Sequence, residues 1–261
     1  MCRFVSFLME KDIIILLVGI VVGAMNAIAG GGMLIGFPVL LSLGVPPLVA
    51  NVTANIITPP GQLAAVYAYR GYLRKVPKRY ILILPFVALG ALAGALTLRA
   101  MPSNNFAELV PLLIMFGVAL FAFQPALHFH LHTHLRGRSK ALLPIVLIGI
   151  ALLPITFYGG FFGAGYGFIM LAFLGLGKVH EVHMLAAMKN VSAILVSLIS
   201  IAVLYSTGLI DWHIGVVMAV GTTIGGYLGA HAAQKVSSHW LRIVIIIVGL
   251  AAATHLALKN Y

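Results

Sequence analysis

Residues 13–32 read IIILLVGIVVGAMNAIAGGG, an apolar run that ends in three consecutive glycines, Gly30, Gly31 and Gly32. A transmembrane helix needs about 20 mainly apolar residues. The next apolar segment, 32–45, has only about 14 residues, which is about 21 Å at 1.5 Å per residue. That length is too short to cross an apolar core of about 30 Å alone. The stretch therefore predicts a helix that glycines break inside a membrane.

The second half of the chain has a similar break, followed by a short apolar segment, 164–177. Its glycines are Gly159, Gly160, Gly163, Gly165 and Gly167. Each break is followed by a polar motif: Ala50-Asn-Val-Thr53-Ala-Asn55 in the first half and Ala186-Ala-Met-Lys189-Asn190 in the second. Glycine-interrupted apolar segments at matching places in two halves indicate the binding site of a transporter.

The composition of the whole chain agrees with a membrane protein. Of 261 residues 62% are hydrophobic and 8% are charged, whereas soluble domains carry about 25% charged residues. We predict an all-α protein of the inner membrane, since a β-barrel would alternate polar and apolar residues. The single cysteine, Cys2, excludes an internal disulfide framework. The predicted apolar segments are 13–29, 32–45, 47–69, 80–99, 107–126, 141–158, 164–177, 183–206, 213–233 and 239–258.

These segments form one membrane domain, 1–261, with a first repeat at 13–126 and a second at 141–258. A basic, histidine-rich loop, predicted to be cytoplasmic, joins them at 127–140. The net charge of +11 lies in short loops, as in cytoplasmic loops of membrane proteins. It therefore indicates contact with the bilayer and not with nucleic acid.

Two topologies fit the loop charges, because both place the basic loop 70–79 in the cytoplasm. If each glycine-broken pair is a hairpin, the halves are inverted repeats, each with a broken pair plus three transmembrane helices. If each pair is a single crossing, the chain has eight spans and parallel repeats. We favour the inverted arrangement because residues 13–44 are too many for one span of about 20 residues.

The motifs of the first half resemble a known family. Gly23-Ala-Met-Asn26-Ala-Ile-Ala-Gly30-Gly31-Gly32, Pro38, Gly44 and Ala50-x-x-Thr53 are similar to the opening repeat of the TauE/SafE sulfite-exporter family. The second half resembles that family's second repeat, with Lys189 where a second threonine is expected. The resemblance implies transport of sulfite, sulfonates or related anions.

The glycine clusters themselves are candidate binding elements. The helices that start after Gly32 and near Gly163 and Gly165 have free N–H groups and a positive dipole end. Two such ends meeting near the middle of the membrane would bind an anion. The alternative is close helix packing, because small residues are common at membrane helix interfaces.

Lys189 is the strongest single candidate for binding the anion, together with its neighbour Asn190. A cation about six residues into an apolar helix is costly unless it finds a partner. We expect Lys189 to hold the anion by its fixed charge. The alternative is that its long side chain reaches the membrane surface.

Polar residues of the first half complete the candidate set. Asn51 and Asn55 share a helix face, and Thr53 lies about 200° away, so a common ligand would require the helix to unwind near Pro59-Pro60. Asn26 precedes the first cluster by one turn. Each of these side chains could instead bond across helices. Gln62 and Tyr158 are weaker candidates.

A histidine tract supports a rival function, a transition-metal permease. In an extended strand His128, His130, His132 and His134 would point to one side, and imidazole suits Zn, Cu or Ni. A solvated loop is the simpler interpretation. A second rival is a membrane enzyme or assembly factor without flux. No Walker A, H-E-x-x-H or G-x-S-x-G sequence occurs, so we predict neither an enzyme nor a cofactor.

Overall fold

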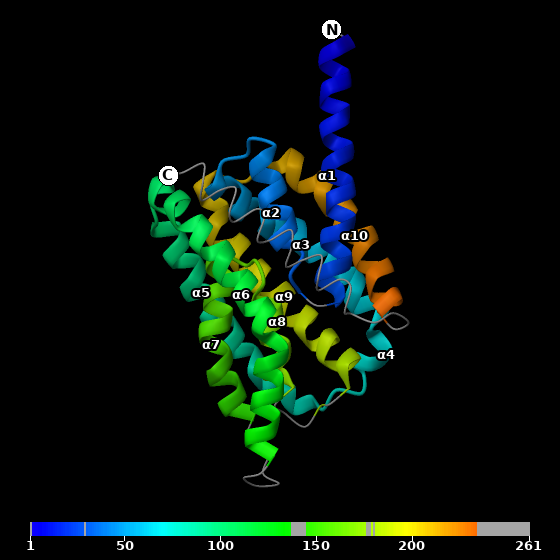
Figure 1. The fold of residues 1–261 in the computed structure, drawn as a ribbon, viewed down its shortest axis with the longest axis vertical. Helices are drawn as coiled ribbons and strands as arrows, with labels where there is room; N and C mark the ends of the chain where they lie inside the picture. Colours follow the sequence, from blue (N-terminus) through cyan, green and yellow to red (C-terminus); the bar gives the residue numbers. More distant parts are fainter. Residues whose placement is uncertain (1, 29, 137–144, 176–178, 180, 234–261) are drawn as a thin grey trace.

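The computed structural model describes residues 2–28, 30–136, 145–175, 179 and 181–233 (Figure 1). All regular elements in these residues are helices, as predicted for an all-α protein. The predicted tenth segment, 239–258, lies outside the described residues. In chain order the elements are α1 (Cys2–Ile28), α2 (Met33–Ser42), α3 (Pro47–Ala68), α4 (Arg70–Leu73), η1 (Lys78–Ile83), α5 (Leu84–Ala100), α6 (Ser103–Arg136), α7 (Ile145–Phe161), α8 (Tyr166–Leu174), α9 (Val182–Leu204), η2 (Tyr205–Thr207) and α10 (Trp212–Ala233).

The outer surface of this bundle is suited to lipid. Large apolar side chains such as Leu17 on α1, Leu89 on α5 and Leu228 on α10 are more than half exposed. Exposed apolar side chains in this number indicate a surface that another apolar phase covers. By length and composition, four described helical stretches can cross a membrane: Lys11–Ile28, Lys78–Ala100, Val182–Thr207 and Trp212–Ala233. The chain is therefore a multi-pass membrane protein.

Glycines reverse the chain at both breaks. Gly30 has a φ of +101° and Gly165, the N-cap of α8, a φ of +88°, a backbone region that costs other residues about 1–2 kcal/mol. Figure 1 shows α2 turning back toward the end of the bundle where α1 begins, and α8 turning back toward the start of α7. The two hairpins open toward opposite ends of the bundle.

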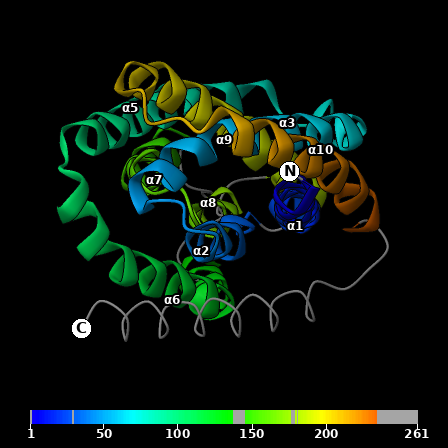
Figure 2. The ribbon, with the colours of Figure 1, turned by 90° about the horizontal axis from the view of Figure 1, so that it is seen from above.

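The two halves interlock through helices packed at glycines. α1 of the first half packs on α10 of the second, and α7 of the second packs on α5 of the first. A Cβ built on Gly19 would lie 2.6 Å from the Met218 carbonyl oxygen, and one on Gly90 would lie 2.6 Å from that of Leu153. Figure 2 shows α2 and α8 between these two packed groups. The short helices therefore meet in the middle of the bundle.

Two local predictions differ from the structure. The predicted loop 127–140 is helical as far as Arg136, the last residue of α6. The extended strand that a one-sided row of imidazoles would require is therefore not present from His128 to His134. In α3 the helix continues through Pro59 and Pro60, and the unwinding that the prolines suggested does not occur.

Candidate functional site

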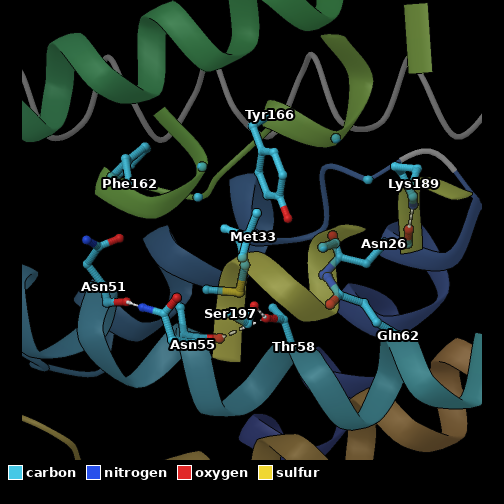
Figure 3. A pocket seen from close by; sticks show the side chains of 17 residues that line it. Asn26, Met33, Asn51, Asn55, Thr58, Gln62, Phe162, Tyr166, Lys189 and Ser197 are labelled. Carbon is cyan, nitrogen blue, oxygen red and sulfur yellow. Dashed lines mark hydrogen bonds between the residues drawn. The ribbon is translucent and has the colours of Figure 1, made fainter. Parts of the chain in front are cut away.

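A cavity lies where the two glycine breaks meet (Figure 3). Its volume is about 30 Å³, on a scale where one water needs about 10–15 Å³. The space therefore holds two or three waters. Its lining comes from α1, α2, α3, α7, α8, α9 and the breaks, and consists of Asn26, Gly30, Met33, Asn51, Ala54, Asn55, Thr58, Gln62, Gly159, Phe162, Gly163, Tyr166, Gly167, Lys189, Ala193, Val196 and Ser197.

The backbones of the two breaks touch each other beside this cavity. A Cβ built on Gly30 would lie 2.8 Å from the Cα of Gly167, and one on Gly167 would lie 2.9 Å from the Cα of Gly30. Real Cβ atoms do not approach other atoms that closely. Glycine is therefore required at both positions if the breaks are to meet.

Lys189 is buried at this junction. Only 1% of it is exposed, so its side chain does not reach the membrane surface. Its ammonium group donates a hydrogen bond to the backbone carbonyl of Asn26, near the end of α1. Next to it, Asn190 Nδ2 donates to the carbonyl of Ala27 at 3.4 Å. Two residues of α9 thus satisfy carbonyls that have no partner at the end of a helix.

The first half makes the matching contact with a neutral side chain. Asn51 of α3 is 2% exposed, and its Nδ2 donates to the carbonyl of Phe161 at 2.9 Å. Phe161 is the last residue of α7. The third helix of each half therefore caps the broken helix of the other half.

No carboxylate lies beside Lys189 among the described side chains. Asp12, Glu108, Glu181 and Asp211 are all at least partly exposed, and Asp12 pairs with His213 at 2.8 Å. The fifth acid, Glu10, lies about 24 Å from Asn26 along α1 at 1.5 Å per residue. The predicted absence of buried carboxylates holds for the four described acids. Lys189 is the charged residue in the cavity lining.

Two helix starts also face the cavity. Met33 begins α2, and Tyr166 and Gly167 begin α8; all three line the space. The first N–H groups of a helix have no carbonyl partner within it and lie at its positive dipole end. The side chain of Asn26 fixes the α2 start, because its Oδ1 accepts the Gly32 N–H at 2.8 Å. In Figure 3 the Tyr166 hydroxyl points into the cavity.

The sequence profile of one family, described as Sulfite exporter TauE/SafE, matches residues 15–256. The chain belongs to the TauE/SafE family. A "Probable membrane transporter protein" of Haemophilus influenzae is 33% identical over 242 residues, which cover 90% of each chain. "Probable membrane transporter protein YfcA" of Escherichia coli K12 is 26% identical over 260 residues, covering 95% of this chain and 90% of the relative. No solved structure matches the chain.

TauE/SafE membership defines the general function. The family and the matched relatives are described as exporters or membrane transporters. The chain is therefore a membrane transporter, and the prediction that it is not an enzyme is confirmed.

Some of the predicted site residues of this TauE/SafE protein line the cavity, and the others do not. Those that line the cavity are Asn26, Gly30, Asn51, Asn55, Gly163 and Lys189. Gly31, Gly32, Thr53, Gly165 and Asn190 do not line it. Thr53 Oγ1 accepts the Asp211 N–H at 3.0 Å, on the face of α3 away from Asn51. Gly31 packs against the Phe168 ring, and Gly165 lies against Leu34.

Sequence reasoning missed several polar lining residues, chiefly Thr58, Ser197 and Tyr166. Thr58 Oγ1 lies 3.1 Å from Ser197 Oγ, so α3 and α9 are bonded across the cavity. A signal was present in α3, because Asn51, Asn55, Thr58 and Gln62 follow one another at intervals of four, three and four residues. That spacing places them on one helix face, as Figure 3 shows.

The histidine tract is not part of this site as far as it is described. In the described residues, no three His, Cys, Asp or Glu side chains are grouped to hold a metal ion. The side chains of His128, His130, His132 and His134 lie outside the described part of the chain. The metal-permease alternative therefore stays a prediction.

Proposed function

We propose that this transporter carries a small anion, namely sulfite, a sulfonate or a related organosulfur anion, and that it binds the anion between the starts of α2 and α8. The observation that carries the proposal is the buried cation Lys189 in a cavity whose lining contains no carboxylate. The sulfur-anion class is favoured by the description of the matched family, Sulfite exporter.

The buried charge needs an anionic partner. A lysine in the middle of a membrane helix costs about 2.5–3.5 kcal/mol on insertion scales. A backbone carbonyl, here that of Asn26, offsets only part of this cost because it carries no full negative charge. An anion that enters the cavity would supply that charge, whereas a cation would be repelled.

The two helix starts add neutral donors to the same site. Free N–H groups at Met33, Tyr166 and Gly167 suit the oxygens of a sulfite or sulfonate group. Hydroxyl groups of Thr58 and Ser197 and the amide of Gln62 lie on the opposite wall. A tetrahedral or pyramidal oxyanion could accept from several of these donors at once.

The cavity must widen to admit such an anion. It holds two or three waters, and sulfite has four heavy atoms. Gly30 and Gly163, both with positive φ, lie at its edge and allow the breaks to change direction without a steric penalty. We infer that the halves rock about these glycines in alternating access. Without an ATP-binding sequence, the energy comes from a gradient of the substrate or of a coupled ion.

The test is uptake into proteoliposomes of labelled sulfite, taurine, sulfoacetate and sulfate by the wild type, Lys189→Gln and Lys189→Met. We expect saturable uptake of at least one sulfur anion by the wild type and strong loss in both variants. The glutamine variant keeps a donor for the Asn26 carbonyl. Loss of uptake in this variant would therefore show that the charge of Lys189 is needed, and not only its hydrogen bond to α1. Equal uptake by wild type and Lys189→Gln would contradict the role of the charge.

A parallel assay addresses the metal alternative. Uptake of Zn²⁺ or Ni²⁺ should be absent in the same vesicles, and replacing His128, His130, His132 and His134 by alanine should leave anion uptake unchanged. Metal uptake that disappears in the histidine variant would reject the anion proposal in favour of a metal permease.

A further inference from the structure

A second cavity lies on the other side of α9, against the connection from α4 through η1 to α5. Its volume is about 300 Å³, and it shares no lining residue with the first cavity. Most of its lining is apolar: Leu73, Val76, Pro77, Tyr80, Ile81, Ile83, Leu84, Met188 and Val191. The remaining residues are Arg74, Lys78 and Ser192.

Two cations stand at the mouth of this cavity. Arg74 and Lys78 are exposed and line it. In the described structure neither is paired with a carboxylate. Other cations of the same segment are held on aromatic rings: Lys75 lies 5.7 Å from the Tyr72 ring centre and Arg79 lies 5.9 Å from that of Tyr80. Arg74 and Lys78 are therefore the pair available to an external anion.

A buried hydroxyl lies in the wall of the same cavity. Ser192 is 1% exposed, and its Oγ has no hydrogen-bond partner in the described structure. Nearly all buried hydroxyls in proteins have a partner. Ser192 is three residues after Lys189 on α9, and its side chain lies on the side of the helix that faces η1 and α5.

The cavity also lies where a membrane meets water. Lys78 begins one membrane-crossing stretch, Lys78–Ala100, and Ser192 belongs to another, Val182–Thr207. Figure 1 shows α4 and the start of α9 at the end of the bundle opposite the N-terminus. Basic residues at this end are expected to face the cytoplasm, where the leaflet carries anionic lipids.

We propose that this cavity binds one anionic phospholipid of the surrounding membrane. Its phosphate lies against Arg74 and Lys78, its acyl chain covers the apolar lining, and an ester carbonyl accepts a hydrogen bond from Ser192. A small hydrated anion fits less well, because most of the lining offers it no donor. The bound lipid contacts Met188 and Val191, next to Lys189, and so holds the helix that carries the charge of the transport site.

The test is native mass spectrometry of the purified full-length protein with phosphatidylglycerol and, separately, phosphatidylcholine of the same chain length. We expect tight retention of one phosphatidylglycerol by the wild type. Arg74→Ala/Lys78→Ala should weaken it at least about tenfold, because two charge-assisted contacts are lost. The control, Lys75→Ala/Arg79→Ala, removes the same charge from the same segment and should change retention less than about twofold.

A third variant, Val191→Trp, fills the apolar part and should reduce phosphatidylglycerol retention while both cations remain. Equal losses in the two double variants would overturn the site, because they would show a general charge effect. Equal retention of phosphatidylcholine would overturn it as well. If inorganic phosphate at millimolar concentration displaces the lipid, the cavity is a vestibule for free anions and the proposal is wrong. Thermal unfolding of each variant checks that it is folded.

Discussion

At the end of α1 the carbonyls of Asn26 and Ala27 accept hydrogen bonds from Lys189 and Asn190, whereas at the end of α7 the carbonyl of Phe161 accepts from Asn51 alone. Both broken helices need donors at their ends. The α7 end shows that a neutral amide is sufficient for this purpose. Capping alone therefore does not explain the charge of Lys189, and this difference between the halves is the reason for proposing that Lys189 binds the anion.

The same comparison extends to the glycines. Gly30 in the first break has positive φ and touches the backbone of Gly167, whereas Gly163 in the second has positive φ but only the Gly159 carbonyl nearby, 3.2 Å from a built Cβ. In the first break one glycine, Gly30, thus has both the positive φ and the close contact, whereas in the second break Gly163 has the positive φ and Gly167 makes the contact. A substitution of Gly30 therefore disturbs two constraints at once, and a substitution of Gly163 mainly one.

The largest effect is expected from Gly30→Ala. Backbone strain of about 1–2 kcal/mol adds to overpacking of about 1–3 kcal/mol, so unfolding free energy should fall by about 2–5 kcal/mol. For Gly163→Ala the free energy of unfolding should fall only by the backbone strain, about 1–2 kcal/mol. Gly71, with an ordinary φ and open space around its Cβ position, is the control. Thermal unfolding in detergent measures all three, and equal losses for Gly30 and Gly163 would contradict the proposed difference between these two glycines.

A charged cap at the second break should be destabilising. Asn51→Lys would place a second cation beside the same cavity without a carboxylate partner, which should lower the free energy of unfolding by about 3 kcal/mol. We expect lower thermal stability and less protein in the membrane. Asn105→Lys, on an exposed position of α6, is the matched control. A stable Asn51→Lys protein with unchanged transport would mean that the two caps are interchangeable.

Making the two caps alike should impair transport more than stability. Lys189→Asn gives the second half the amide of the first and removes the charge-assisted hydrogen bond that Lys189 is proposed to make to the anion, a bond that contributes about 1.5–3 kcal/mol to binding. The KM for the anion should rise about 10- to 100-fold, while the unfolding temperature stays the same or rises. Uptake kinetics in proteoliposomes measure the KM. A lower unfolding temperature with unchanged KM would assign Lys189 to structure alone.

The smallest effect on transport is expected from the uncharged polar residues of α3 that line the cavity. Thr58→Val removes the hydroxyl that bonds Ser197 across the cavity, a loss of about 0.5–1.5 kcal/mol. The KM should rise about two- to tenfold. Thr97→Val, on the exposed face of α5 where the hydroxyl bonds only the Ala93 carbonyl, is the control. If both variants have the same KM as the wild type, the α3 wall does not contact the substrate.

Much of the fold followed from local patterns. The apolar segments and the glycine clusters at 30–32 and 159–167 predicted the helices and both breaks, because length and glycine content act within a few residues. The end of α6 was missed: charge and histidine content at 127–140 indicated a loop, although none of these residues prevents a helix as far as Arg136.

The site was only partly predictable, because its contacts join distant parts of the chain. Asn51 and Lys189 could be selected as polar residues after matching glycine clusters. Their partners at the ends of α7 and α1 depend on how the halves interlock, which no local pattern contains. The polar face of α3 could have been predicted, since the four-three-four spacing from Asn51 to Gln62 places these residues on one side of a helix.

The most direct test of the central claim is a crystal structure of the protein soaked with selenite, the heavier congener of sulfite, with anomalous scattering used to locate selenium. We predict one selenium peak within hydrogen-bond distance of the Lys189 ammonium, between the starts of α2 and α8, and its absence in Lys189→Met crystals. A peak elsewhere in the protein, or one that persists unchanged in the Lys189→Met crystals, would contradict an anion site built on this lysine.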